Sequence, residues 1–278
     1  MISIVRQCSF PSVAGRWLGV WLLVGPFLLR AEPPAQEFQG STERIECYQM
    51  ALADLKEALN TVSSALIQAQ GIYDDAVTQG EESVASASNT ERVTLEALHK
   101  LYTEKLLDTM VRLAAEYEIM AGKLEAVKAY GKALEYASRV AETHGACAEV
   151  YEAEAIASSQ KSGFDLAGQM YEKAYASYGT AQAKWQQALR LLKLLGGNLG
   201  DKEIRERIEV SAGRGVAALR AAATVYFSAY QAHREKATSG PVDIYSQTAG
   251  EEWRLAALAQ QNHERVVLIV KSIEKTHQ

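Results

Sequence analysis

The stretch at residues 45–76, IECYQMALADLKEALNTVSSALIQAQGIYDDA, decides the fold class of this chain. Its apolar and tyrosine positions recur in alternating steps of three and four, at Ile45, Tyr48, Leu52, Leu55, Leu59, Val62, Leu66, Ala69, Tyr73 and Ala76. Such a heptad stripe predicts a long helix with one face packed against a partner helix. A second stripe of the same period covers residues 164–195, where large aromatic side chains alternate with alanine.

Between these two stripes, the sequence predicts one very long helix. Ser88 and Glu91 have the spacing of a capping box, which predicts that the helix begins there. No proline occurs between Pro34 and Pro241, so we expect this helix to continue for about 65 residues, or roughly 100 Å. The stretch SSQKSG (158–163) is its predicted end, and the pair His144-Gly145 is a predicted kink.

Two further helices are expected after the glycine-rich turn at residues 196–200. The first begins at Asp201 and has small residues on its apolar face, which favours a close approach of backbones. The turn at residues 238–241 ends it. The second covers about 250–275, with Trp253, Ala256, Val267 and Val270 facing inward. No segment alternates like a β-strand.

The expected fold is therefore all-α, an elongated antiparallel coiled-coil-like bundle of about five helices, two of them very long. We expect residues 32–278 to form a single domain. The composition, with 48% hydrophobic and 23% charged residues, is that of a globular chain. The net charge of −5 argues against a nucleic-acid binder, which must neutralise phosphates.

Residues 1–31 resemble a secretory signal peptide. They contain three arginines and no acidic residue, and an apolar run at 17–29 is too short to span a bilayer. Ala31 and Ala35 are candidate residues before the cleavage point. A mitochondrial transit peptide and an uncleaved anchor are the alternatives. The favoured interpretation predicts a secreted or cell-surface protein, whose attachment to a membrane the sequence leaves open.

Cys47 and Cys147 are the two cysteines beyond this leader. An even pair in an oxidising compartment predicts a disulfide that closes a loop of about 100 residues. The alternative is two free thiols, buried as small apolar residues. No Cys-x-x-Cys pair supports a zinc site or thioredoxin-type chemistry.

Two resemblances follow from these patterns. The stretch LAAEYEIMAGKLEAVKAYGKALEYA (113–137) looks like a tetratricopeptide unit, and GFDLAGQMYEKAY (163–175) resembles the second helix of another. This resemblance implies an adaptor that binds peptides or partner proteins, with a turn at residues 121–123. The spacings of 41 and 55 residues between the shared Ala/Tyr windows depart from the 34 of that family.

The leader, the sparse cysteines, the alanine-rich heptads and the polar turns also resemble trypanosome surface proteins of the invariant surface glycoprotein and haptoglobin–haemoglobin receptor type. This second resemblance implies a secreted or surface-exposed long helical bundle. The chain departs from the usual pattern because it shows neither a lipid-anchor tail nor an N-glycosylation sequon.

The sequence predicts no catalytic residue, no cofactor and no metal. His144 and Cys147 share a helix face but match no nucleophile motif. Glu96 with His99, and Glu274 with His277, have the Glu-x-x-His spacing of bundle metal sites, so a metal-binding bundle is an alternative.

The favoured function is protein–protein recognition by a rigid, non-catalytic scaffold. The partner is another protein or, in a homo-oligomer, a further copy of this chain. The connecting segments 80–89, 196–200 and 237–249 are the expected contact sites, because loops carry function on rigid scaffolds.

Overall fold

The computed structural model describes residues 38–197, 200–239 and 247–276. Within these residues the chain is all-helical and contains no strand, so the predicted all-α helical bundle is confirmed. Six helices are described: α2 (Gln39–Gln79), α3 (Glu82–Ala126), α4 (Tyr130–Gln160), α5 (Phe164–Leu194), α6 (Asp201–Ser239) and α7 (Gln247–Thr276).

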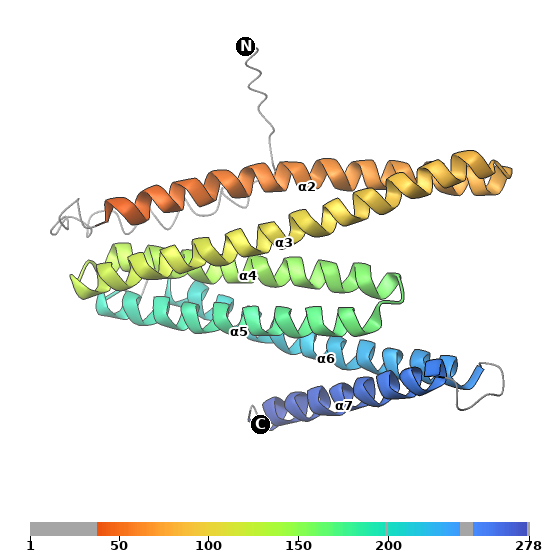
Figure 1. Ribbon diagram of the computed structural model, residues 1–278. Coiled ribbons are helices and arrows are strands. Elements are labelled where there is room, and N and C mark those ends of the chain that lie inside the picture. Colours follow the sequence, from red (N-terminus) through yellow and green to blue (C-terminus); the bar gives the residue numbers. More distant parts are fainter. Residues whose placement is uncertain (1–37, 198–199, 240–246, 277–278) are drawn as a thin grey trace, which may run out of the picture.

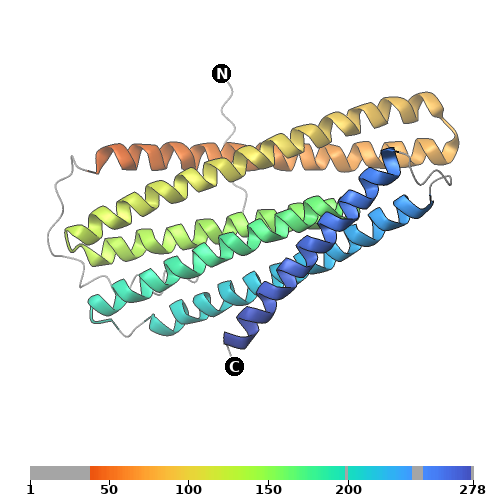
Figure 2. The same cartoon turned by 60° about the horizontal axis from the view of Figure 1, so that its bottom comes forward.

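The helices stack in chain order, each antiparallel to the one before it (Figure 1). Every helix packs against the helices that precede and follow it in the chain, and α4 also makes a small contact with α6. The helices α2 and α7 therefore form the two edges of the array. Figure 2 shows α7 crossing α6 obliquely and α3 crossing α2, whereas α4 and α5 lie side by side. No helix in the described ranges is both long enough and apolar enough to cross a bilayer.

The predicted apolar stripes are the surfaces on which the helices pack. Every residue of the stripe at 45–76 is buried or half-buried along the α2–α3 contact. The main core gathers at one end of the array, where Leu113 and Tyr117 of α3 meet Val140 of α4 and Trp185 of α5. Burying each such large side chain stabilises the fold by about 1.5–3 kcal/mol, which exceeds the contribution of helix propensity.

Four of the turns that join the helices share one geometry. In each, a residue in the left-handed region follows the helix, and the next amide donates back to a carbonyl five residues earlier, as in a Schellman motif. The left-handed residues are Gly80 (φ 73°), Lys128 (φ 61°), Ser162 (φ 61°) and Gly196 (φ 70°). The back-bonding amides belong to Glu81, Ala129, Gly163 and Gly197, at 2.8–3.2 Å from their acceptors.

The turn at Lys128 corrects the prediction of one helix of about 65 residues. The helix α3 ends at Ala126 and α4 begins at Tyr130, so the predicted helix is two antiparallel helices. The turn lies after 126, while Gly122 is inside an unbroken helix, so the turn at 121–123 required by the tetratricopeptide interpretation is absent. A tetratricopeptide unit holds two helices within about 34 residues, whereas each single helix of this chain has 30 to 45 residues.

The predicted helix start at Ser88 is also wrong. The helix α3 begins at Glu82, directly after the Gly80 turn, and the Ser88 hydroxyl donates to the Val84 carbonyl inside it at 2.8 Å. The kink predicted at 144–145 is absent, because α4 is continuous through both residues. The turn predicted at 158–163 is confirmed by the end of α4, and α5 ends at Leu194, directly before the described part of the predicted turn at 196–200.

Two tyrosine hydroxyls link successive helices in the second half of the array through shared carboxylates. Tyr178 on α5 donates to Glu152 on α4 at 2.9 Å, and Arg214 on α6 donates to the same carboxylate at 2.8 Å while lying over the Tyr178 ring. One helix later, Tyr226 on α6 and Arg265 on α7 both donate to Glu172 on α5. Burial and the carboxylate raise the pKa of each tyrosine, so the hydroxyl remains a donor.

Candidate recognition site

The structure leaves both cysteines free, so the predicted disulfide is absent from it. Cys47 is exposed on α2, whereas Cys147 is buried on α4 against Leu106 and Met110. The α2 residues beside that cluster are Leu52, Leu55 and Leu59. Cys47 lies about eight residues from their centre, or roughly 12 Å along the helix, which is beyond the span of about 7 Å that a disulfide can bridge.

Cys147 also lacks the properties of a nucleophile. Burial raises the pKa of its thiol to about 11, so the reactive thiolate is scarce at neutral pH. Burial lowers the pKa of His144, which keeps this imidazole neutral. The two residues share a helix face as the sequence predicts, but their environments favour neutral, packed side chains.

The residues with metal-site spacing do not come together. Glu96 on α3 pairs with Arg92 and Lys161, while Glu274 on α7 pairs with Arg220 at the opposite edge of the array. His99 lies 3.9 Å from Glu154, and His277 lies outside the described residues. Across the described ranges, no cluster of three histidine, cysteine or carboxylate ligands is present.

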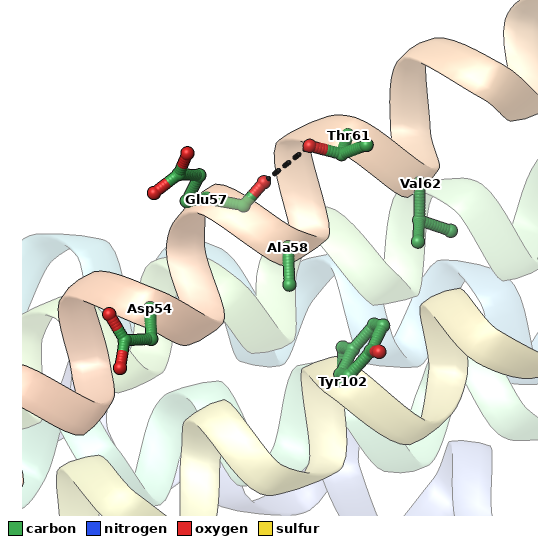
Figure 3. A pocket seen from close by; sticks show the side chains of 6 residues that line it. All are labelled: Asp54, Glu57, Ala58, Thr61, Val62 and Tyr102. Carbon is green, nitrogen blue, oxygen red and sulfur yellow. Dashed lines mark hydrogen bonds between the residues drawn. The ribbon is translucent and has the colours of Figure 1, made fainter. Parts of the chain in front are cut away.

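A shallow depression of about 350 Å³ lies along the α2–α3 contact (Figure 3). Asp54 and Glu57 border it from α2, and Tyr102 of α3 contributes the only ring. The Thr61 hydroxyl is occupied by the Glu57 carbonyl, to which it donates at 3.0 Å. The lining therefore presents two exposed carboxylates beside the apolar side chains of Ala58 and Val62, and no cationic side chain borders it.

The far end of the α2–α3 hairpin lies beyond the helices that pack on α3. Lys161, in the α4–α5 turn, reaches Glu96 of α3 at 2.9 Å, so α4 and α5 turn back near this point of the hairpin. Figure 1 shows this pair extending past the α4–α5 turn. We call residues 67–96 the distal hairpin. Its length from Glu96 to the turn at Gly80 is about 20 Å at 1.5 Å per residue.

The distal hairpin has a packed interior and an acidic exterior that includes exposed aliphatic side chains. Ala69, Ala76 and Ser88 are buried between its two helices. Five aliphatic side chains are nevertheless exposed, by 40–74%: Ile67, Ile72, Val77, Val84 and Val93. The chain also has no basic residue between Lys56 and Arg92, whereas it has acidic residues at 57, 74, 75, 81, 82 and 91. The hairpin is thus a rigid, acidic projection with exposed aliphatic groups.

Of the three predicted contact segments, 80–89 lies on this hairpin, although only its first two residues form a turn and the rest is helical. Part of 196–200 and of 237–249 lies outside the described residues. The hairpin was only partly recognisable from sequence. Its heptads predict the helix pair, but nothing in the pattern shows that α4 and α5 stop short of it.

Comparisons with known proteins assign this chain to no family. No family model matches the sequence, and no curated protein matches it. Among solved structures, a chain titled "DHF58 filament" is similar at 20% sequence identity, over 87% of this chain and 100% of that chain. The TM-score of this match is 0.26, too low to support any argument about fold or assembly. These findings show neither a tetratricopeptide protein nor a trypanosome surface protein.

Proposed function

We propose that this chain is an exported, non-catalytic helical scaffold that recognises a protein partner through the distal hairpin. The observation that carries the proposal is the hairpin itself, a two-helix projection that exposes five aliphatic side chains. Soluble proteins seldom gather exposed apolar groups on a projecting element unless a partner covers them. Because the hairpin has a packed interior, it loses little conformational entropy on binding.

The charge of the hairpin indicates the chemistry of this partner. Acidic residues at 74, 75, 81 and 82 surround the turn and are exposed, and the nearest basic side chain, Arg92, is held by Glu96 and Asn89. A partner surface with basic residues around an apolar patch is complementary to such a tip. Self-association through two tips would bring like charges together, so we propose a different protein as the partner.

Export is supported by the leader at 1–31, which lies outside the described residues. Its three arginines, apolar run and lack of acidic residues are typical of a signal peptide. The test is expression in a secreting host followed by N-terminal sequencing of the released protein. Cleavage directly after Ala31 or Ala35 supports export, and a secretion-incompetent chain that keeps Met1 overturns it.

The recognition site is tested by photo-crosslinking. A benzophenone side chain replaces Val84 on the hairpin or, as a matched control, Ile119, an equally exposed aliphatic residue on the body of α3. Native extracellular fluid or membrane is then irradiated with each labelled protein, and crosslinked species are identified by mass spectrometry. We expect a basic protein crosslinked from position 84 alone, with a yield that falls as salt is added.

Substitutions provide the second arm of this test. Val77→Asp combined with Val84→Asp is expected to abolish the crosslinked species, while Ile119→Asp leaves it unchanged. Circular dichroism checks that both variants keep their helical content. Equal crosslinking from positions 84 and 119, or binding that survives the double substitution, would contradict the proposed site. A crosslinked second copy of this chain would replace the proposed partner by a homodimer.

A further inference from the structure

His233 on α6 lies between two carboxylates from the neighbouring helices. Its Nδ1 is 2.6 Å from Glu252 Oε2 on α7, and its Nε2 is 2.8 Å from Asp165 Oδ2 on α5. The imidazole is mostly buried, with 15% of the side chain exposed. Because a carboxylate only accepts hydrogen bonds, both ring nitrogens must carry protons for both bonds to form. The geometry is therefore that of an imidazolium joining three helices.

We propose that His233 is a pH-sensitive latch, whose imidazolium bridge to Asp165 and Glu252 holds the N-terminal half of α7 on the array and whose deprotonation loosens that half. The neutral ring has a single N–H, so it donates to one carboxylate and turns a lone pair toward the other. Deprotonation thus replaces one charge-assisted bond by a repulsive contact at less than 3 Å.

The rest of α7 explains why the effect is confined to one half. The C-terminal half buries Val266 and Val270 against Leu219 and Tyr226 of α6. It is also held by ion pairs of arginine with glutamate, Arg265 with Glu172 and Arg220 with Glu274.

The N-terminal half of α7 has much weaker apolar anchoring. Its fully buried residues are Ala256 and Ala259, which remove little apolar surface from water. Trp253, which the sequence predicts to face inward, is instead 45% exposed. The His233 bridge therefore supplies a large share of the attachment of this half.

The charged groups around the latch fix the direction of its response. Burial lowers the pKa of His233, but the hydrogen bonds to Glu252 and Asp165 outweigh it, so this pKa is raised above its ordinary value. On α7, Glu251 and Arg254 pair with each other. On α6, Arg234, Glu235 and Lys236 follow the histidine and are exposed.

Because the folded pKa is raised, the stabilisation is fully present below the unfolded value of about 6.5 and is lost as pH rises through the folded value. The latch therefore holds at weakly acidic pH and loosens at alkaline pH.

Hydrogen exchange read by mass spectrometry tests the latch on the purified chain. Amide protection of residues 250–262 is measured at about pH 6 and about pH 9, after correction for the intrinsic exchange rate. We expect about tenfold lower protection at the higher pH, confined to this segment, with residues 263–276 unchanged. In His233→Gln, which carries no titrating proton, protection of 250–262 should be low and equal at the two values.

His263→Gln is the matched control, because His263 bonds the Ala223 carbonyl rather than a carboxylate. It should keep the pH dependence. Glu252→Gln removes one charged acceptor, so the loss of protection should begin at lower pH, and this variant decides the matter if His233→Gln does not fold. Equal protection of 250–262 at both pH values in the unmodified chain, or a pH dependence that persists in His233→Gln, would overturn the proposal.

Discussion

At the scale of single residues, Gly168 on α5 allows a close approach of the Tyr226 ring on α6. A Cβ added at Gly168 would lie 2.6 Å from two ring carbons. The ring cannot retreat easily, because its hydroxyl donates to Glu172 on α5, and Arg265 on α7 donates to the same carboxylate. We expect Gly168→Ala to lower the free energy of unfolding by about 1–3 kcal/mol, measured by chemical denaturation.

Gly179, eleven residues later on the same helix, is the control for this substitution. Nothing lies within 4 Å of a Cβ added there. Gly179→Ala should therefore raise the free energy of unfolding by about 0.5–1 kcal/mol, because alanine loses less backbone entropy in a helix. If both variants change stability in the same direction, the close approach of α5 and α6 at Gly168 is not as described.

The two cysteines make a second test at this scale. Cys47 is exposed, and Cys147 is buried with a raised pKa of about 11. At weakly alkaline pH an alkylating reagent should label Cys47 within minutes and label Cys147 only after denaturation. Peptide mass spectrometry measures both rates. Protection of Cys47 from labelling that a reductant removes, or a Cys47–Cys147 peptide in the native protein, would restore the disulfide predicted from the sequence.

At the scale of the helices, the turns decide where each element ends. Lys128 and Ser162 adopt left-handed backbone, which costs a residue with a side chain about 1–2 kcal/mol relative to glycine. We expect Lys128→Gly to raise the free energy of unfolding by about 1 kcal/mol. The control Lys105→Gly, on the exposed face within α3, should lower it by a similar amount, about 1 kcal/mol. Thermal or chemical unfolding followed by circular dichroism compares the two.

A decrease in stability for Lys128→Gly would mean that α3 continues through residue 128, as the sequence predicts, instead of turning there. The same logic applies to Ser162→Gly at the α4–α5 turn. This element-level test is independent of every proposal about function, because it measures the fold alone.

At the scale of the whole molecule, the distal hairpin is separable from the core. None of the buried clusters that join three helices includes a residue from 67–96. Deleting 69–75 from α2 together with 89–95 from α3 removes one heptad from each helix and keeps their register. We expect the shortened chain to unfold within a few degrees of the original, with weaker partner crosslinking because Ile72, Val93 and the carboxylates at 74 and 75 are lost. A collapse in melting temperature would show that the hairpin is part of the folding unit.

The agreement between sequence and structure is best where local pattern and packing coincide. The stripe at 45–76 is the buried face of α2, and the predicted helix at 164–195 corresponds to α5 (Phe164–Leu194). Gly215, predicted to allow close approach, packs against Tyr175 and Tyr178. These features could be predicted from the sequence because heptad spacing and small residues act within one helix and its nearest neighbour.

The predictions that were wrong fall at places where the local sequence allows two structures of nearly equal free energy. Lys128 gives no glycine or proline signal, so the turn that divides α3 from α4 was invisible, and about 1–2 kcal/mol of left-handed strain is offset there by tertiary packing. Ser88 has the residues of a capping box, but packing between α2 and α3 carries the helix past it to Glu82. The turn at Lys128 changed the number of helices and the earlier start of α3 changed only one boundary, while the all-α class stayed the same.

The sequence by itself determined that this chain is helical and which faces of its helices are apolar, because those properties follow from spacing within a single helix. Only the tertiary structure decided that Cys47 and Cys147 lie apart and that α2 and α3 project beyond their neighbours. It also decided that His233 meets carboxylates 68 and 19 residues away. The physical reason is that these contacts depend on where each helix turns and crosses the next, and that geometry is set by packing between residues far apart in the chain.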